Sequence, residues 1–124
     1  MEIENIKFKA KRLDGKGWVK GSLIRSTTGI KEIAYIVDNF SSMSDYSVIG
    51  VDPSTVCQFA GLKDKNGTPI YEGDIVIYKD NNAERRGDIN WDSKAAAFCF
   101  GCDFLVNYFS EYMVVVGNKF DKEK

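Results

Sequence analysis

The chain has 124 residues, a formal net charge of −1 and no histidine. This length suits one modest core, because folding removes roughly two-thirds of the unfolded surface from water at this size. The near-neutral charge excludes bulk attraction to nucleic acid or anionic lipid, so such binding needs a local patch. No apolar run approaches the roughly 20 residues that span a membrane. Three cysteines and a start unlike a secretory signal favour a reducing cytoplasm.

The first part of the chain predicts short antiparallel strands. Ile6, Phe8 and Ala10 alternate with lysines, which is the period of a strand with one buried and one wet face. Trp18 to Ile24 resumes this alternation after a glycine-containing turn, and therefore predicts a hairpin. We expect Ser26 to Gly29 to break that second strand.

Two further strands are predicted before a proline. Ile33 to Val37 is rich in β-branched and aromatic types and predicts a buried strand. Residues 38–45 predict a long loop, and residues 46–51 another strand. Asp52-Pro53 removes a backbone donor and restricts its neighbour, so we expect a boundary there. The prediction is a single domain with an N-terminal β lobe, about 1–51, and a C-terminal barrel-like lobe, about 52–124.

The C-terminal lobe contains the strongest turn signal. Lys63 to Gly67 holds an Asn-Gly pair, which tolerates the positive φ angles of tight turns. Strands are predicted at 74–79, 87–91, 95–100 and 113–116, with residues 80–86 as a polar loop. Apolar residues between 103 and 112 have helical spacing, which predicts one short helix. Many short strands predict a mostly-β barrel or sandwich rather than a parallel α/β sheet.

The absence of histidine is the main restriction on catalysis. It removes the commonest general base, the Ser-His-Asp and Cys-His arrangements, and most zinc sites. A carboxylate pair, Glu72 and Asp74, is the remaining route to hydrolysis, since residues two apart on a strand share a face. The competing interpretation is that Glu72-Gly73-Asp74 forms a turn whose carboxylates accept hydrogen bonds from the backbone. We favour the turn and expect no enzyme.

Cysteine chemistry is also disfavoured. Cys99 and Cys102 have the spacing of redox and metal sites, but the redox version needs its first cysteine at a helix N-terminus. A tetrahedral zinc site would also have to recruit Cys57 and a carboxylate such as Asp103. We therefore expect cysteines that act as small hydrophobes, with no metal and no cofactor.

Single-stranded nucleic-acid binding is a second class of function. Small β-barrels stack bases on exposed aromatic side chains and hold phosphates with cations. The candidate ligand-binding residues are Trp18, Arg85, Arg86 and Trp91. Other aromatic residues and cations that would suit the same function are Tyr35, Tyr78, Lys20, Arg25 and Lys79. The competing interpretation is that aromatic residues at alternating strand positions form core and that paired arginines in a loop form a solvated face.

One long segment carries a family resemblance. From Val51 the chain has VDPSTVCQFAGLKDKNGTPIYEGDIVIY, then GDINWD at 87–92 and VVVGNKFD at 114–121. These segments resemble the YopX family of phage and prophage proteins, and IKFKA at 6–10 and GWVKG at 17–21 are similar to its first two strands. We predict that the motif glycines supply turns and that Ile70, Ile75 and Ile77 supply core. The motif residues, with predicted structural roles, are Gln58, Gly61, Leu62, Asp64, Asn66, Gly67, Glu72, Gly73 and Asp74.

The resemblance implies a mostly-β fold with SH3-like barrel character in the C-terminal portion, a phage or prophage origin, and no established activity. We expect a non-enzymatic binding or assembly module in the cytoplasm of a bacterial host, with a phage or host protein as a partner. A homo-oligomer is expected, because an aromatic-rich domain of this size has edge strands to protect. A single-stranded nucleic-acid binder and a carboxylate-dependent hydrolase are the alternatives.

Overall fold

The computed structural model describes residues 5–28, 31–38 and 47–121. Within these ranges the chain is mostly β, with two antiparallel sheets and helical turns of three residues each. The predicted fold class is therefore confirmed. The SH3-like character of the C-terminal portion stays a prediction.

The chain forms two compact units that divide between Gln58 and Phe59. This division lies later in the chain than the expected boundary at Asp52-Pro53. The reason is strand pairing, since Gln58 still pairs with Phe8 of the first unit. That the two units are lobes of one domain stays a prediction.

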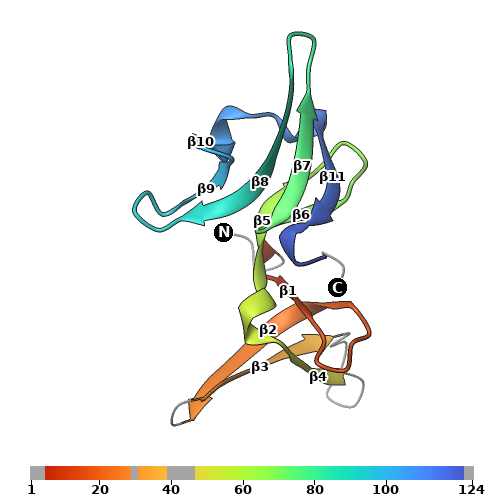
Figure 1. Cartoon of the computed structure of the whole chain (residues 1–124), viewed down its shortest axis with the longest axis vertical. Helices are drawn as coiled ribbons and strands as arrows, with labels where there is room; N and C mark the ends of the chain where they lie inside the picture. The colour runs from red at the N-terminus through yellow and green to blue at the C-terminus, as the bar shows by residue number, and fades with distance from the viewer. Residues whose placement is uncertain (1–4, 29–30, 39–46, 122–124) are drawn as a thin grey trace. The chain divides into compact units, whose positions relative to one another are not determined.

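The first unit is an antiparallel sheet of sequential hairpins in the strand order β4-β3-β2-β1-β5 (Figure 1). This sheet closes on itself, because Arg12, just after β1, bridges to Val51 at the end of β4. Leu13 N also donates to Gly50 O over 3.1 Å, so this end of β4 is not a free edge. The elements are β1 (Phe8–Lys11), β2 (Trp18–Thr28), β3 (Lys31–Asp38), β4 (Ser47–Val51), the 3-10 turn η2 (Pro53–Thr55) and the start of β5 (Cys57–Lys63).

Alternation decides which residues of the first unit are buried. Ala34 and Ile36 of β3 are buried, whereas Tyr35 between them is 37% exposed, so the predicted buried strand is buried on one face only. The predicted break at Ser26 is wrong, because β2 pairs with β3 as far as Thr28. Of the loop predicted at 38–45, Asp38 belongs to β3, and the rest lies outside the described residues. The core of this unit is Ala10, Val19, Ala34, Ile36 and Val51.

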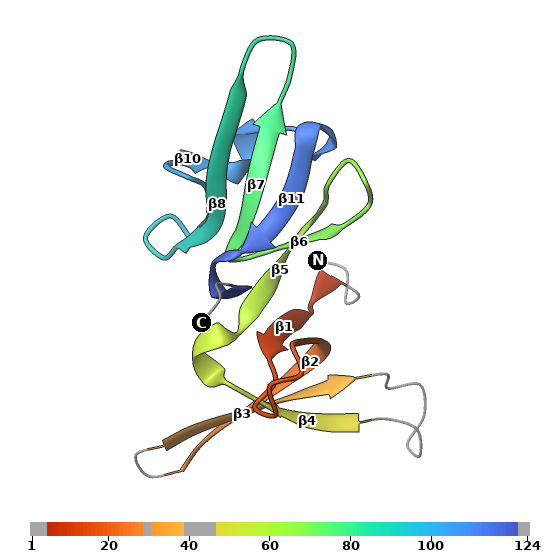
Figure 2. The same ribbon diagram turned by 45° about the vertical axis from the view of Figure 1, so that its right-hand side comes forward.

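The second unit contains a five-stranded sheet in the order β10-β9-β8-β7-β11, and Figure 2 shows β8, β7 and β11 side by side. The β5–β6 hairpin contributes Ile70 to the core of this unit. Its elements are the rest of β5, β6 (Pro69–Tyr71), β7 (Asp74–Lys79), β8 (Glu84–Asp92), β9 (Ala97–Phe100), β10 (Asp103–Phe104), η3 (Leu105–Asn107), η4 (Ser110–Tyr112), β11 (Met113–Asn118) and η5 (Lys119–Asp121).

Three predictions for the second unit need correction. Residues 84–86 belong to β8 rather than to a loop, because a turn of residues 80–83, closed by Asp80 N to Ala83 O over 3.1 Å, suffices to connect β7 with β8. Residues 103–112 form a short strand and two 3-10 turns instead of one helix. The core prediction for Ile75 and Ile77 is wrong, because β7 turns Val76 inward and leaves both isoleucines half-buried.

Candidate functional site

The motif residue Asp64 joins the β5–β6 turn to β11. Its Oδ1 accepts hydrogen bonds from Asn66 N and Thr68 N, and its Oδ2 accepts one from Val115 N, each over 2.9 Å. The side chain is only 6% exposed. Burial alone would raise the pKa of Asp64, but the backbone donors together outweigh it and hold the pKa below its usual value. Asp64 therefore has a structural role.

This pKa shift predicts acid sensitivity. Because the folded pKa of Asp64 lies below the unfolded value, its stabilisation is present above the unfolded pKa and is lost as pH falls through the folded pKa. We expect Asp64→Asn to lower the free energy of unfolding of the second unit by about 2 kcal/mol at neutral pH. The difference from the unmodified protein should shrink as the pH falls below the ordinary pKa of an aspartate, about 3.9. Urea unfolding followed by Trp91 emission measures both, with Asp92→Asn as the control, since Asp92 holds only an exposed turn.

A second buried carboxylate, Asp74, joins the turn at Gly73 to the end of β11. Its Oδ2 accepts from Tyr71 N over 2.8 Å, and its Oδ1 accepts from Asn118 Nδ2 over 2.9 Å. Gly73 has a φ of +88°, and a Cβ at this position would lie 3.1 Å from Asn118 Nδ2. The motif glycine therefore permits both the turn and the close approach of Asn118.

The carboxylate pair of the hydrolase hypothesis is not arranged as an acid and a base. Asp74 is 1% exposed and its carboxylate is held by Tyr71 and Asn118, whereas Glu72 is only half-buried. The positive φ of Gly73 interrupts the strand alternation that would place both carboxylates on one face. This geometry is that of the turn interpretation.

The other motif residues also have structural surroundings. Gly67 lies in the β5–β6 turn, with a φ of +84° and its N–H bonded to Asp64 O. The turn predicted at Gly61 is wrong. Gly61 lies in β5, at a register shift of the β5–β6 pairing, with a φ of +90°. Asn66 contributes its backbone N–H to Asp64. Gln58 pairs with Phe8 across the β1–β5 ladder.

The cysteines are not gathered into one site. Cys57 and Cys99 are buried, Cys102 is exposed, and none of the three forms a disulfide bond in the described part of the chain. Burial raises the pKa of Cys99, which disfavours a reactive thiolate. Within the described ranges, no three histidine, cysteine or acidic residues are grouped to hold a metal ion.

The four predicted ligand-binding residues do not form one described site. Trp18 belongs to β2 of the first unit, whereas Arg85, Arg86 and Trp91 belong to β8 of the second. Arg85 and Arg86 are exposed neighbours on a strand, so their side chains leave opposite faces of the sheet. Trp91 is 44% exposed and packs edge-on against Phe98, with ring centroids 5.0 Å apart.

Arg85 is engaged by a carboxylate and an aromatic ring. Its Nη1 donates to Asp103 Oδ2 over 3.0 Å and to the Tyr108 hydroxyl, and that hydroxyl donates to Asp103 Oδ2 over 2.6 Å. The hydrogen bonds from Tyr108 and Arg85 lower the pKa of Asp103. The guanidinium carbon also lies 5.3 Å from the centroid of Tyr108. Asp103 therefore offsets the charge that Arg85 would offer to a phosphate.

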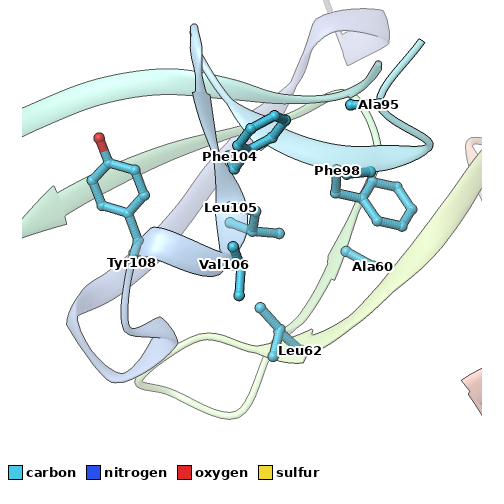
Figure 3. A pocket seen from close by; sticks show the side chains of 9 residues that line it. Ala60, Leu62, Ala95, Phe98, Phe104, Leu105, Val106 and Tyr108 are labelled. Atoms are coloured by element: carbon cyan, nitrogen blue, oxygen red, sulfur yellow. The ribbon is translucent and has the colours of Figure 1, made fainter. Parts of the chain in front are cut away.

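The second unit has an open apolar pocket of about 560 Å³. Its walls come from β5, from β9 and the turn before it, and from β10 and η3 (Figure 3). Val106 on this wall is 87% exposed and Phe104 is 45% exposed. Side chains of the wall include Ala60, Leu62, Phe98, Phe104, Leu105 and Val106.

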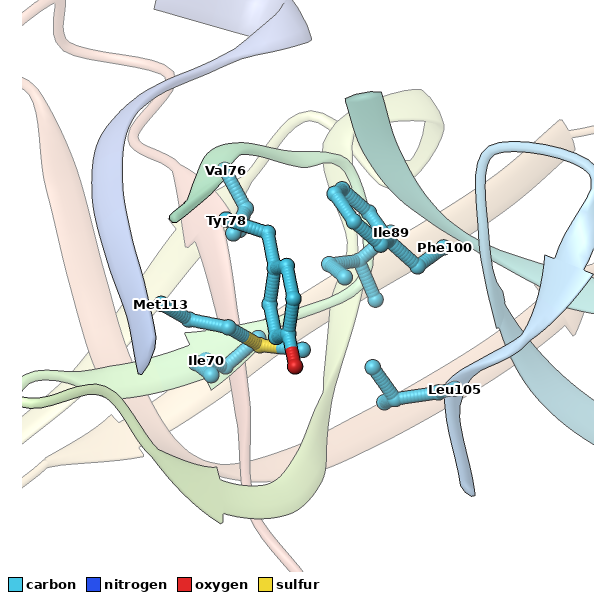
Figure 4. Close-up of a cluster of buried hydrophobic side chains, with 7 residues drawn as sticks. All are labelled: Ile70, Val76, Tyr78, Ile89, Phe100, Leu105 and Met113. Atoms are coloured by element: carbon cyan, nitrogen blue, oxygen red, sulfur yellow. The ribbon is translucent and has the colours of Figure 1, made fainter. Parts of the chain in front are cut away.

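The pocket lies against the buried core of the second unit. Leu105 belongs both to the wall and to the buried cluster, in which Tyr78 lies between Phe100 and Ile89 on one side and Met113 and Ile70 on the other (Figure 4). Tyr108 lines the pocket and bonds to the Arg85–Asp103 pair, which therefore gives the apolar hollow one polar rim. Such a combination of apolar walls and few polar groups is typical of binding sites.

Sequence reasoning did not select the pocket residues. The sequence predicts only a motif role for Leu62, and it places Phe104 and Val106 within the helix predicted at 103–112. Their apolar character alone carries no signal, because isolated exposed hydrophobic residues are common on protein surfaces. Only the pairing of β9 with β10 brings Phe104 beside β9 and its Phe98.

Comparisons with known proteins identify the family of the chain. The family model described as YopX protein matches residues 7–122. No curated protein and no solved structure matches the chain. Among the described residues, no helix has the length and apolar character needed to cross a membrane. With 7–122 of 124 residues matched, the chain belongs to the YopX family.

Proposed function

We propose that the protein is a non-enzymatic assembly module of phage or prophage origin, which acts in the cytoplasm of its bacterial host and associates with a second copy of itself. The observation that carries this proposal is the open apolar pocket with Val106 protruding beside it. Exposed apolar patches rimmed by polar residues are typical of protein interfaces.

A second copy is the occupant that this surface fits best. A two-fold interface uses the same patch on both partners, so the patch must offer a projection as well as a hollow. Val106 and Phe104 are projections on the wall of the hollow itself. The short strand β10 lies at the edge of its sheet in the same region, and association would cover this edge.

The lack of an enzymatic role is supported by the engagement of the motif carboxylates. Asp64 and Asp74 accept hydrogen bonds from the protein itself and hold the β5–β6 turn and the Gly73 turn to β11. The carboxylate chemistry of the motif thus has a structural explanation. Measurement of oligomeric state is the direct test of the proposal.

We expect light scattering to show a dimer that dissociates on dilution. Val106→Asp should give a monomer with unchanged thermal stability, because a charge within an apolar interface is strongly unfavourable while an 87% exposed side chain contributes little to folding. Val116→Asp is the matched control, since Val116 is 48% exposed on β11 and does not line the pocket. A monomer at every concentration, or equal dissociation by both variants, would reject this interface. Cross-linking to phage or host proteins would then be the next measurement.

A further inference from the structure

Lysines gather around Trp18 on one face of the first unit. The register of β1 and β2 places Lys9 opposite Lys20 and Lys11 opposite Trp18. Opposed residues lie on the same side of an antiparallel pair, and residues two apart on one strand share a side. The other side of β1 carries Ala10, which is buried in the core. We call Lys9, Lys11, Trp18 and Lys20 the lysine–tryptophan face.

Two of these lysines converge on one aromatic ring. Lys9 Nζ lies 4.7 Å and Lys11 Nζ 5.5 Å from the centroid of the Trp18 ring. The ring attracts each ammonium group through its quadrupole, but the two ammonium groups repel each other. Lys9 and Lys20 are also opposed across the strand pair, which is unfavourable for like charges.

Residues 5–20, which surround this face, are rich in cations. Asp14, the one acidic residue among them, pairs with Arg12 over 2.8 Å at the β1–β2 turn. Phosphate groups are attracted to such a local concentration of positive charge. Residues 5–20 hold one carboxylate and the cations Lys7, Lys9, Lys11, Arg12, Lys16 and Lys20.

We propose that the lysine–tryptophan face binds single-stranded nucleic acid. The three lysines contact backbone phosphates, and Trp18 stacks on an unpaired base when the ammonium groups over its ring turn to the phosphates. Duplex DNA keeps its bases stacked inside, and lipid headgroups have no base, so the aromatic ring favours a single strand over both. This site differs from the set predicted from sequence, because it keeps Trp18 and replaces Arg85, Arg86 and Trp91 by lysines of β1 and β2.

Titration of a labelled oligothymidine, followed by anisotropy, tests the proposal. We expect Lys9→Gln with Lys11→Gln to weaken binding and to lower the slope of log affinity against log salt by about 1.4, since each phosphate contact on a single strand contributes about 0.7. Lys63→Gln with Lys94→Gln is the matched control, because it changes the net charge equally at two exposed lysines of the second unit. Equal weakening by both pairs would overturn the site.

Replacing Trp91 leaves Trp18 as a fluorescent reporter, so the place at which the oligothymidine binds can be tested while the lysine–tryptophan face stays intact. In Trp91→Phe, Trp18 is the only tryptophan, and we expect the oligothymidine to quench its emission. Trp18→Leu should weaken binding about 5- to 150-fold, as loss of one base stack predicts. Binding without quenching of Trp18 would overturn the stacking contact.

Two further outcomes separate the occupants. Equal affinity for duplex DNA, or binding to phosphatidylserine–phosphatidylcholine vesicles without binding to the oligothymidine, would overturn the single-strand assignment. Val106→Asp, which tests association between copies, lies in the other unit and should leave the intrinsic affinity of this face for the oligothymidine unchanged. Failure of one proposal is therefore distinguishable from failure of the other.

Discussion

Asp74→Asn is expected to lower the free energy of unfolding of the second unit by about 3 kcal/mol. The substitution replaces one of two buried acceptor atoms by an NH2 group. That group then faces either Tyr71 N or Asn118 Nδ2, which are themselves donors. One hydrogen bond to a charged group is lost and one buried donor is left without an acceptor. Because small domains are stable by only about 5–15 kcal/mol, this is a large fraction of the total.

Urea unfolding followed by Trp91 emission measures this effect, since Trp91 is the tryptophan of the second unit. Asp80→Asn is the matched control, because Asp80 accepts hydrogen bonds from Asn82 N and Ala83 N in an exposed turn. We expect the control to cost about 1 kcal/mol or less. A stable Asp74→Asn protein would show that the network around Asn118 is dispensable, and would make the carboxylate available for the hydrolase hypothesis again.

Gly21→Ala is expected to destabilise the first unit by about 3 kcal/mol or more. Gly21 has a φ of +154°, and a Cβ added there would lie 2.1 Å from Val37 O, a backbone atom of β3. A backbone atom cannot rotate away as a flexible side chain can, so β2 and β3 must separate at this point. The strands that would lose pairing, β2 and β3, form the longest hairpin of the first unit.

Gly15→Ala separates the clash from backbone strain. Gly15 has a φ of +80°, but an added Cβ would meet nothing within 4 Å. We therefore expect only the left-handed penalty of about 1–2 kcal/mol. Unfolding monitored through Trp18 emission compares the two variants, and equal losses of stability would exclude the contact with Val37 as the cause.

Local patterns in the sequence predicted several elements of the second unit well. The apolar run within Asp74 to Lys79 predicts a strand, and the observed strand β7 has the same bounds. The Asn-Gly pair located the β5–β6 turn, because Gly67 needs a positive φ there. Both features are determined by residues that are close together in sequence, and the sequence alone therefore predicts them.

Elements decided by distant partners were not predictable in this way. β6 (Pro69–Tyr71) has three residues and begins with proline, so it carries no periodic signal of its own. Arg85 and Arg86 look like loop residues but form a strand because they pair with Tyr78 and Ile77. Apolar spacing at 103–112 is typical of a helix, whereas the segment forms short 3-10 turns, and tertiary packing buries Leu105 in the first of them, η3.

The candidate sites show the same division. The sequence singled out Trp18, but not Lys9 and Lys11, whose relation to the indole depends on the β1–β2 register. It also singled out Asp74 as a motif residue. Its partner Asn118 is 44 positions away, and nothing local connects them.

The bonds of β11 to the motif also set the order in which the protein can fold during synthesis. The first unit's sheet can close when Val51 has left the ribosome, since its bridge to Arg12 then exists. The second unit must wait for β11, because Asp64 and Asp74 find their partners at Val115 and Asn118. Ribosomes stalled before β11 should therefore carry a protease-resistant first unit and a second unit that is still cleaved, although the motif residues from Gln58 to Asp74 have already been made.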